Sequence, residues 1–300
     1  MTWVFEQIGN GFSEVLDGPV WDGGGLLFCK VITGEVLRWD EKTGDISTVR
    51  RFTVRTTGLA FGPDGELYAA QSGARRIAWY KKDGSAQALT ALLNGARHNH
   101  PHHLAVDRRR RIWFSDPYSK LRTRGPQMFP LLEHRSVLRL DYESPPREWV
   151  LRRMTFDTKE PRGVALSPDE TTLYVAESAS ERDGKREVRA YPILESGLGP
   201  PRVLHTFGAD HRGAHRGAAG ICVDSEGNVV VAAGSRDNGP GPLIYVFAAS
   251  GRVLESHTVP ADRPTACAFG GEDLATLFVT TEDGYLFQVL NTGRVGTSTR

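Results

Sequence analysis

Cysteine is scarce in this chain, and long apolar runs are absent. The 300 residues include three cysteines, Cys29, Cys222 and Cys267, each inside an apolar stretch. That is too few and too scattered for a disulfide framework or a cysteine metal site. No segment approaches the roughly 18 consecutive apolar residues of a membrane-spanning helix, and the first residues lack the basic start and apolar stretch of a signal peptide. We therefore expect a cytoplasmic protein with no membrane partner.

A surplus of charge of either sign is also missing. The 37 basic residues almost balance the 36 acidic residues, which leaves a formal net charge of +1. Electrostatic binding to nucleic acid or to a membrane surface requires a basic surplus, so we expect neither partner. A small molecule is the expected ligand, and the oligomeric state is left open.

What the chain does have is an internal repeat. An apolar strand runs into a turn rich in Pro, Ser, Asp and Gly and continues into a second apolar strand, in copies that begin near residues 17, 57, 102, 162, 219 and 265. Further strand-like stretches follow, such as SVLRLDY from Ser136. Three to four strands per repeat are typical of propeller blades, and no long window shows the period of a helix. We predict an all-β fold, a six-bladed β-propeller with a central channel, as a single domain over residues 1–300.

One connection is longer than its blade requires. Residues 118–132 read YSKLRTRGPQMFPLL, where a short turn would be enough. Long structured loops of this kind are often lids. The segment is therefore predicted to be either a lid over the site or an outer loop.

The first ends of the innermost strands should share one mouth of the channel. The residues at these positions are Asp17, Thr57, His102, Arg162, Ala219 and Thr265. The third of these ends lies in a histidine-rich segment, NHPHHLAVD from Asn99. Because residues i and i+2 of an extended segment face the same side, His100 and His102 are predicted to point together and His103 to point the other way. Imidazole acts as a general base near neutral pH and also binds zinc or iron.

The chain resembles the senescence marker protein/gluconolactonase family, also called regucalcin-like, over nearly its whole length. The strings that carry this resemblance include DGPVWDGGG at Asp17, PRGVALSPDETTLYVAES at Pro161 and AAGICVDSEGNVVVA at Ala218. The resemblance implies one divalent cation in the channel, often calcium, held by a Glu, two Asn and an Asp. It also implies hydrolysis of a lactone or an organophosphate ester.

Carried over residue by residue, the family's four ligand positions are mostly replaced. The Glu falls on Asp17, the two Asn on His102 and Arg162, and the Asp on Ala219. Three hypotheses are therefore open. Asp17 and Arg162 form an ion pair in a metal-free site; or Asp17, His100 and His102 bind zinc or iron in preference to calcium; or the channel binds a ligand without catalysis.

The predicted function is a hydrolase that acts on a lactone or a similar small cyclic ester. His102, Asp17 and Arg162 are the predicted catalytic residues, with His102 activating water and Arg162 stabilising the oxyanion. The segment HPHHLAVDRRRRIWFSDP also resembles streptogramin-lyase-like propellers, which open a lactone by elimination, so a histidine-based lyase or isomerase is the alternative beside a non-catalytic binding propeller. Further substrate-binding candidates are His100, His103, Glu133, Thr57 and His215.

Overall fold

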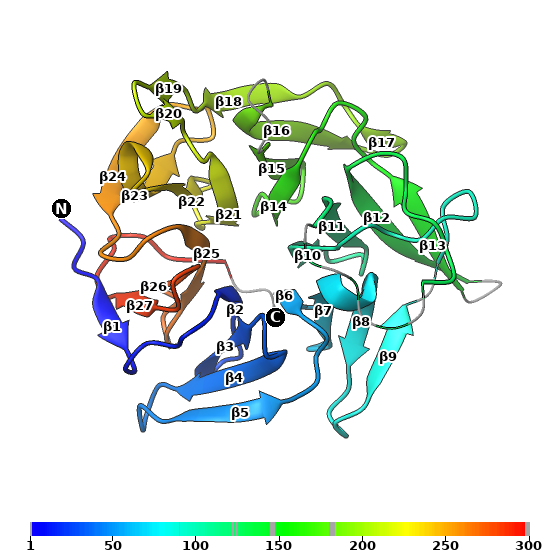
Figure 1. Cartoon of the computed structure of the whole chain (residues 1–300), viewed down its shortest axis with the longest axis horizontal. Helices are drawn as coiled ribbons and strands as arrows, with labels where there is room; N and C mark the ends of the chain where they lie inside the picture. The colour runs from blue at the N-terminus through cyan, green and yellow to red at the C-terminus, as the bar shows by residue number, and fades with distance from the viewer. Residues whose placement is uncertain are drawn as a thin grey trace.

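Six antiparallel sheets stand as blades around a central channel in the computed structural model, which describes residues 2–89, 91–119, 121, 123, 125, 127–144, 148–179 and 184–297 (Figure 1). The predicted six-bladed β-propeller is thereby confirmed. Within the described part of the chain, no helix has the length and apolar character needed to cross a membrane.

The strands follow one another from the channel outward within each blade. The first three blades consist of β2 (Leu16–Trp21), β3 (Gly25–Lys30), β4 (Glu35–Asp40) and β5 (Ile46–Arg50); β6 (Thr56–Phe61), β7 (Leu67–Gln71), β8 (Arg76–Tyr80) and β9 (Ala86–Leu89); and β10 (Leu104–Val106), β11 (Ile112–Asp116), β12 (Ser136–Glu143) and β13 (Glu148–Arg153). A short 3-10 helix, η1 (Ser72–Ala74), joins β7 to β8.

The remaining blades keep this order and add small edge pairings. The fourth has β14 (Pro161–Leu166), β15 (Thr172–Ser178) and β16 (Arg186–Leu194), with β17 (Gly197–Leu198) and β18 (Arg202–Thr206) both paired to β16. The fifth has β21 (Ala218–Val223), β22 (Val229–Ser235), β23 (Asn238–Phe247) and β24 (Val253–Thr258), preceded by the small ribbon of β19 (Ala209–Asp210) and β20 (Gly213–Ala214).

The last blade joins the two ends of the chain. Its inner three strands are β25 (Pro264–Gly270), β26 (Thr276–Thr281) and β27 (Leu286–Val289), and its outermost strand is β1 (Glu6–Ile8). Gln7 of β1 pairs with Phe287 of β27 in antiparallel register. A strand from the beginning of the chain therefore closes the ring.

The hydrophobic core lies between neighbouring blades. Trp113 and Val137 of the third blade, for example, pack in one cluster with Leu173 and Val175 of the fourth. The other five clusters likewise join adjacent blades. Burying such a side chain stabilises the fold by about 1.5–3 kcal/mol, and each blade obtains this burial only from its neighbours.

Neighbouring inner strands touch at one level of the channel, which we call the belt. A Cβ added to Gly58 would lie 2.5 Å from the carbonyl oxygen of His102, and one added to Gly163 would lie 2.6 Å from that of Ala219. Glycine is needed here because backbone packs directly on backbone. In the sequence repeat, the belt positions are Gly18, Gly58, His103, Gly163, Gly220 and Ala266.

Replacing a belt glycine should destabilise the propeller. We expect Gly58→Ala to lower the free energy of unfolding by about 1–3 kcal/mol, because its methyl group overlaps the backbone of the next blade. Gly208→Ala is the matched control, since a Cβ there meets nothing within 4 Å. Urea unfolding of both variants measures the effect. Equal stability of the two would contradict the close contact at the belt.

Candidate functional site

The mouth of the channel is built from bulged ends of the inner strands. Pairing to the second strand shifts register between Asp17 and Val20 in the first blade, and similar shifts occur in four other blades. Bulges bend a strand and redirect its side chains. In the third blade, His102 and His103 precede β10, and both pair with Ser115: His102 N donates to Ser115 O at 2.9 Å, and Ser115 N donates to His103 O at 3.0 Å.

Asp17 and two histidines form a buried cluster at this mouth. One carboxylate oxygen of Asp17, Oδ1, lies 2.8 Å from His103 Nε2, and Oδ2 lies 3.7 Å from His102 Nε2. The backbone N–H of Gly18 donates to Oδ1 at 2.9 Å. Asp17 and His103 are 3% and 7% exposed, so this pair is screened little by water.

The cluster holds a carboxylate beside a neutral imidazole. Burial alone would raise the pKa of Asp17, but His103, His102 and the Gly18 N–H together lower it below its usual value. Burial, the neighbouring His103 and the charges of Arg162 and Arg216 hold the pKa of His102 well below its usual value, against the opposing effect of Asp17. At neutral pH His102 is therefore an uncharged base, and its buried Nδ1 has no hydrogen-bond partner among the described residues.

The hypothesised ion pair between Asp17 and Arg162 is wrong. Among the described residues, the carboxylate of Asp17 pairs with the two histidines, whereas Arg162 Nη2 donates to Glu160 Oε1 at 3.2 Å. Glu160 lies two residues before Arg162 on the same chain segment. Behind it, the buried Glu177 accepts the backbone N–H groups of Lys159, at 2.6 Å, and of Glu160. A local partner thus neutralises Arg162 in place of one from another blade.

Arg216 is a second guanidinium near the mouth that the sequence analysis missed. It donates to the carbonyl oxygen of Pro264 at 3.0 Å and to Glu282 Oε2 at 3.3 Å. Burial lowers its pKa to about 10, with Arg162 and Arg263 adding to the effect and Glu282 opposing it. The available sequence signal was its place three residues before Ala219, at the end of a Gly-rich segment.

His100 lies apart from the Asp17 cluster. Its Nδ1 accepts the backbone N–H of Ser119 at 3.1 Å, and burial together with Arg75 and Arg55 lowers its pKa to about 4. The predicted alternation that paired His100 with His102 does not hold, because the segment before Leu104 is not a regular strand. His103 is the neighbour of His102 instead, with ring centroids 4.5 Å apart.

His103 was predicted to point away from His102, and the repeat itself contains a signal that it lies beside it. Four belt positions are glycine and one is alanine; His103 alone carries a ring there. That ring reaches Asp17 of the first blade.

The remaining candidates occupy supporting or outer places. Thr57 Oγ1 donates to the His102 carbonyl at 2.9 Å, so it positions the histidine backbone. His215 stacks on Phe207 at 4.7 Å, with its Nδ1 accepting the N–H of Gly217. Glu133 is exposed. Their roles in substrate binding stay predictions.

Part of segment 118–132 is tied to the histidine-rich turn. The buried Arg75 donates to the carbonyl oxygens of Phe129, at 2.9 Å, Pro130, at 2.8 Å, and His98, at 2.9 Å. The Arg75 side chain thus joins residues 129–130 of this segment to His98, which precedes the histidine-rich segment. Residues 120, 122, 124 and 126 lie outside the described residues, and the predicted lid role stays a prediction.

The donor set suits some metal ions and not others. One ligand atom each from Asp17, His102 and His103 lies within 4.8 Å of the others. Calcium takes six to eight oxygen ligands, which a single carboxylate with two imidazoles and Ala219 does not provide. Two imidazoles and a carboxylate are a ligand set of catalytic zinc sites, so the cluster fits an ion of that kind.

Comparison with known proteins identifies what the chain is similar to. The family model described as SMP-30/Gluconolactonase/LRE-like region matches residues 15–283. A gluconolactonase of Zymomonas mobilis is 28% identical over 88% of this chain and 75% of its own length. A 6-deoxy-6-sulfogluconolactonase of Pseudomonas putida is 26% identical over 85% of this chain and 78% of its own.

Solved structures of the same kind of protein also resemble this chain. A gluconolactonase of Xanthomonas campestris superposes with a TM-score of 0.77 at 27% identity, covering 96% of this chain and 89% of that one. A streptogramin B lyase superposes with a TM-score of 0.60 at 12% identity, covering 96% of this chain and 97% of that one. The likeness to the lyase shows the fold alone.

Stability should fall on acidification because several histidines are buried in the neutral form. Burial, with Arg97 and Arg75, lowers the pKa of His98 to about 3. Below the ordinary histidine pKa of about 6.5, the unfolded chain binds a proton that folded His98 does not, so the free energy of unfolding decreases by about 1.4 kcal/mol per pH unit down to about pH 3. We expect His98→Phe to make this decrease shallower by that amount between pH 6 and 4.

Urea unfolding at several pH values measures the slope. His211→Phe is the control, because it removes an exposed histidine instead of a buried one. An unaltered slope in His98→Phe would show that His98 takes up its proton in the folded protein.

Proposed function

The chain belongs to the SMP-30/gluconolactonase/LRE-like family, and from that membership we propose that it is a hydrolase that opens a lactone or a similar activated ester of a small molecule at the channel mouth. The observation that carries the proposal is the buried hydrogen bond between Asp17 and His103, set beside the neutral imidazole of His102. The relatives named gluconolactonase and 6-deoxy-6-sulfogluconolactonase support the substrate class.

Asp17 and His103 position the base. His103 donates to Asp17 Oδ1, and the carboxylate in turn lies 3.7 Å from His102 Nε2. A carboxylate beside an imidazole stabilises the imidazolium that forms when the ring takes a proton. Because the cluster is buried, its charges act on one another with little screening.

His102 takes the proton in the hydrolytic step. Water attacks the ring carbonyl carbon while His102 accepts one of its protons, and a tetrahedral oxyanion forms. The bond between that carbon and the ring oxygen then breaks, and the leaving oxygen receives the proton back from His102. The product is a hydroxy acid that has gained one water.

Arg162 stabilises the oxyanion. Its side chain is 35% exposed and makes its ion pair with Glu160 through Nη2. Guanidinium groups aimed at developing negative charge stabilise it. Asp17, His102 and His103 would hold an ion of the zinc type, which would act as a Lewis acid on the substrate carbonyl; His102 would then be a ligand, so its role as proton acceptor belongs to the site without an ion.

Loss of the base should cost turnover far more than stability. We expect His102→Ala to lower kcat/KM for gluconolactone by about 10²–10⁴-fold, the usual contribution of a general base. His211→Ala is the matched control and should keep full activity, because His211 is exposed outside the cluster. Hydrolysis in ¹⁸O-labelled water should place one label in the product acid; unlabelled product would indicate elimination. A fully active, folded His102→Ala protein would exclude His102 as the base.

Calcium removal should leave the activity unchanged. The position that offers a fourth ligand in the resembled family is Ala219 here, and Arg162 replaces another, so hard oxygen ligands are too few for calcium. We expect no gain in activity on addition of calcium, and any activity that EGTA removes should return with zinc and not with calcium, measured by lactone hydrolysis at neutral pH. If EGTA inactivates the protein and calcium alone restores the activity, the site binds calcium despite the replaced ligand positions.

A further inference from the structure

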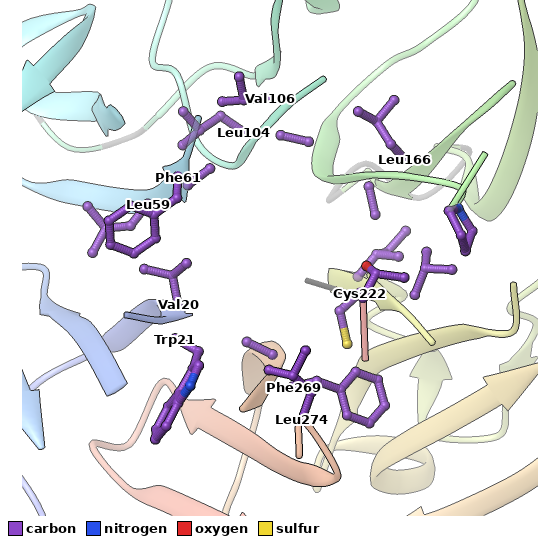
Figure 2. A pocket seen from close by; sticks show the side chains of 18 of the residues that line it. Val20, Trp21, Leu59, Phe61, Leu104, Val106, Leu166, Cys222, Phe269 and Leu274 are labelled. Atoms are coloured by element: carbon purple, nitrogen blue, oxygen red, sulfur yellow. The ribbon is translucent and has the colours of Figure 1, made fainter. Parts of the chain in front are cut away.

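At the end opposite the Asp17 cluster, the channel opens into an apolar cavity. Its volume is about 790 Å³, and the last residues of the six inner strands and the turns after them line it. Figure 2 shows side chains such as Leu59, Leu104, Leu166 and Phe269 around the open space. Cavities of roughly 300–1,000 Å³ with mostly apolar linings are typical of small-molecule sites. Its size and lining therefore suit a small apolar molecule.

Two thiols meet in the wall of this cavity. Cys222 of β21 and Cys267 of β25 both line it, and their Sγ atoms are 3.5 Å apart. Cys267 is 5% exposed, and Cys222 is more accessible. Burial and the neighbouring Cys267 raise the pKa of Cys222 well above its usual value, so Cys222 is an uncharged thiol at neutral pH.

The separation of the sulfurs fits a bridging atom better than a disulfide. A disulfide needs its sulfurs about 2.05 Å apart, which would require the pair to close by roughly 1.5 Å between two packed inner strands. A single atom bonded to both sulfurs at about 2.3 Å, as in metal–thiolate bonds, separates them by roughly 3.3–3.8 Å for angles of about 90–110°. The observed 3.5 Å lies inside that range.

A hydrated metal ion is a poor occupant of this place. The residues that line the cavity beside the thiols are apolar, among them Ile221 and Phe269, and the charged lining residues, such as Arg108, Glu170 and Glu272, come from the turns. A divalent ion would bind both sulfurs as thiolates, but the apolar lining beside them offers no further ligands to complete a four-coordinate site. A neutral molecule with an apolar substituent can bury that substituent in the cavity. It has no charge whose hydration would be lost on binding.

We propose that Cys222 and Cys267 form a dithiol site for a neutral, apolar, thiophilic small molecule, of which a trivalent organoarsenical is the fitting class. The step is a condensation without change of oxidation state. An organoarsenic(III) dihydroxide forms two As–S bonds as both S–H protons combine with its two hydroxides, and two water molecules leave. The product is neutral, and its organic group occupies the cavity.

Phenylarsine oxide tests the site on the full-length protein. Intact mass spectrometry should show one phenylarsenic group per chain, two hydrogens less, in the wild-type protein and in Cys29→Ser, whose pair is intact. Cys222→Ser and Cys267→Ser should show none, although each keeps two cysteines. Inorganic arsenite should compete at least 10-fold more weakly, because it has no apolar group to bury. An excess of a small dithiol should remove the adduct, and a monothiol should not.

Three results would overturn the proposal. The first is an adduct that persists in Cys222→Ser or Cys267→Ser. The second is arsenite binding as tightly as phenylarsine oxide, which would show that the cavity contributes nothing to the affinity. The third is a folded wild-type protein, checked by circular dichroism, that takes no adduct or that loses two hydrogens to an internal disulfide. Activity does not enter the test, so it stands or falls separately from the proposed hydrolase.

Discussion

The backbone contact between neighbouring inner strands is the constraint on which this propeller depends. Where Gly58 lies against the His102 carbonyl and Gly163 against that of Ala219, no side chain separates the strands. That contact sets how closely neighbouring blades approach. It therefore also sets how tightly the hydrophobic side chains between the blades pack. It also fixes the width of the channel at the belt. Any side chain at a belt position must either displace a neighbour or extend into the channel.

His103 extends into the channel, and the chemistry of the mouth depends on its position. Asp17 is almost fully buried, and an unpaired buried carboxylate would be costly. The ring at the belt supplies its partner at 2.8 Å, so the carboxylate stays ionised without an ion from solution. The same pair places an electrostatic acceptor near His102, whose neutrality depends on burial and on two nearby guanidinium groups. A site of this composition favours proton transfer by imidazole over an oxygen cage for calcium.

The fold could be predicted from the sequence because the repeat encodes it directly. The turns and alternating strands define each blade, and inner strands begin where the repeat begins. The site was harder to predict. His100 and His102 were paired by the alternation of a regular strand, but the segment before Leu104 is not a regular strand, so the alternation fails there and His103 faces Asp17 instead. Likewise, Arg162 was matched to the one carboxylate visible at the mouth, whereas Glu160, two residues away, is its partner. The sequence pattern gives position around the ring but not side-chain direction at a bulge.

The seam between the third and fourth blades connects these side chains mechanically. Ser115 donates its backbone N–H to the His103 carbonyl, and its hydroxyl donates to the carbonyl of Arg162. One buried serine of β11 thus holds the backbone of the histidine pair and that of the arginine together. Since His102 is neutral partly because Arg162 is near, a shift of this seam would change both the basicity of the imidazole and the place of the guanidinium. The proposed base, His102, and the proposed oxyanion partner, Arg162, are therefore positioned as one unit by packing between blades, not by a bond between their side chains.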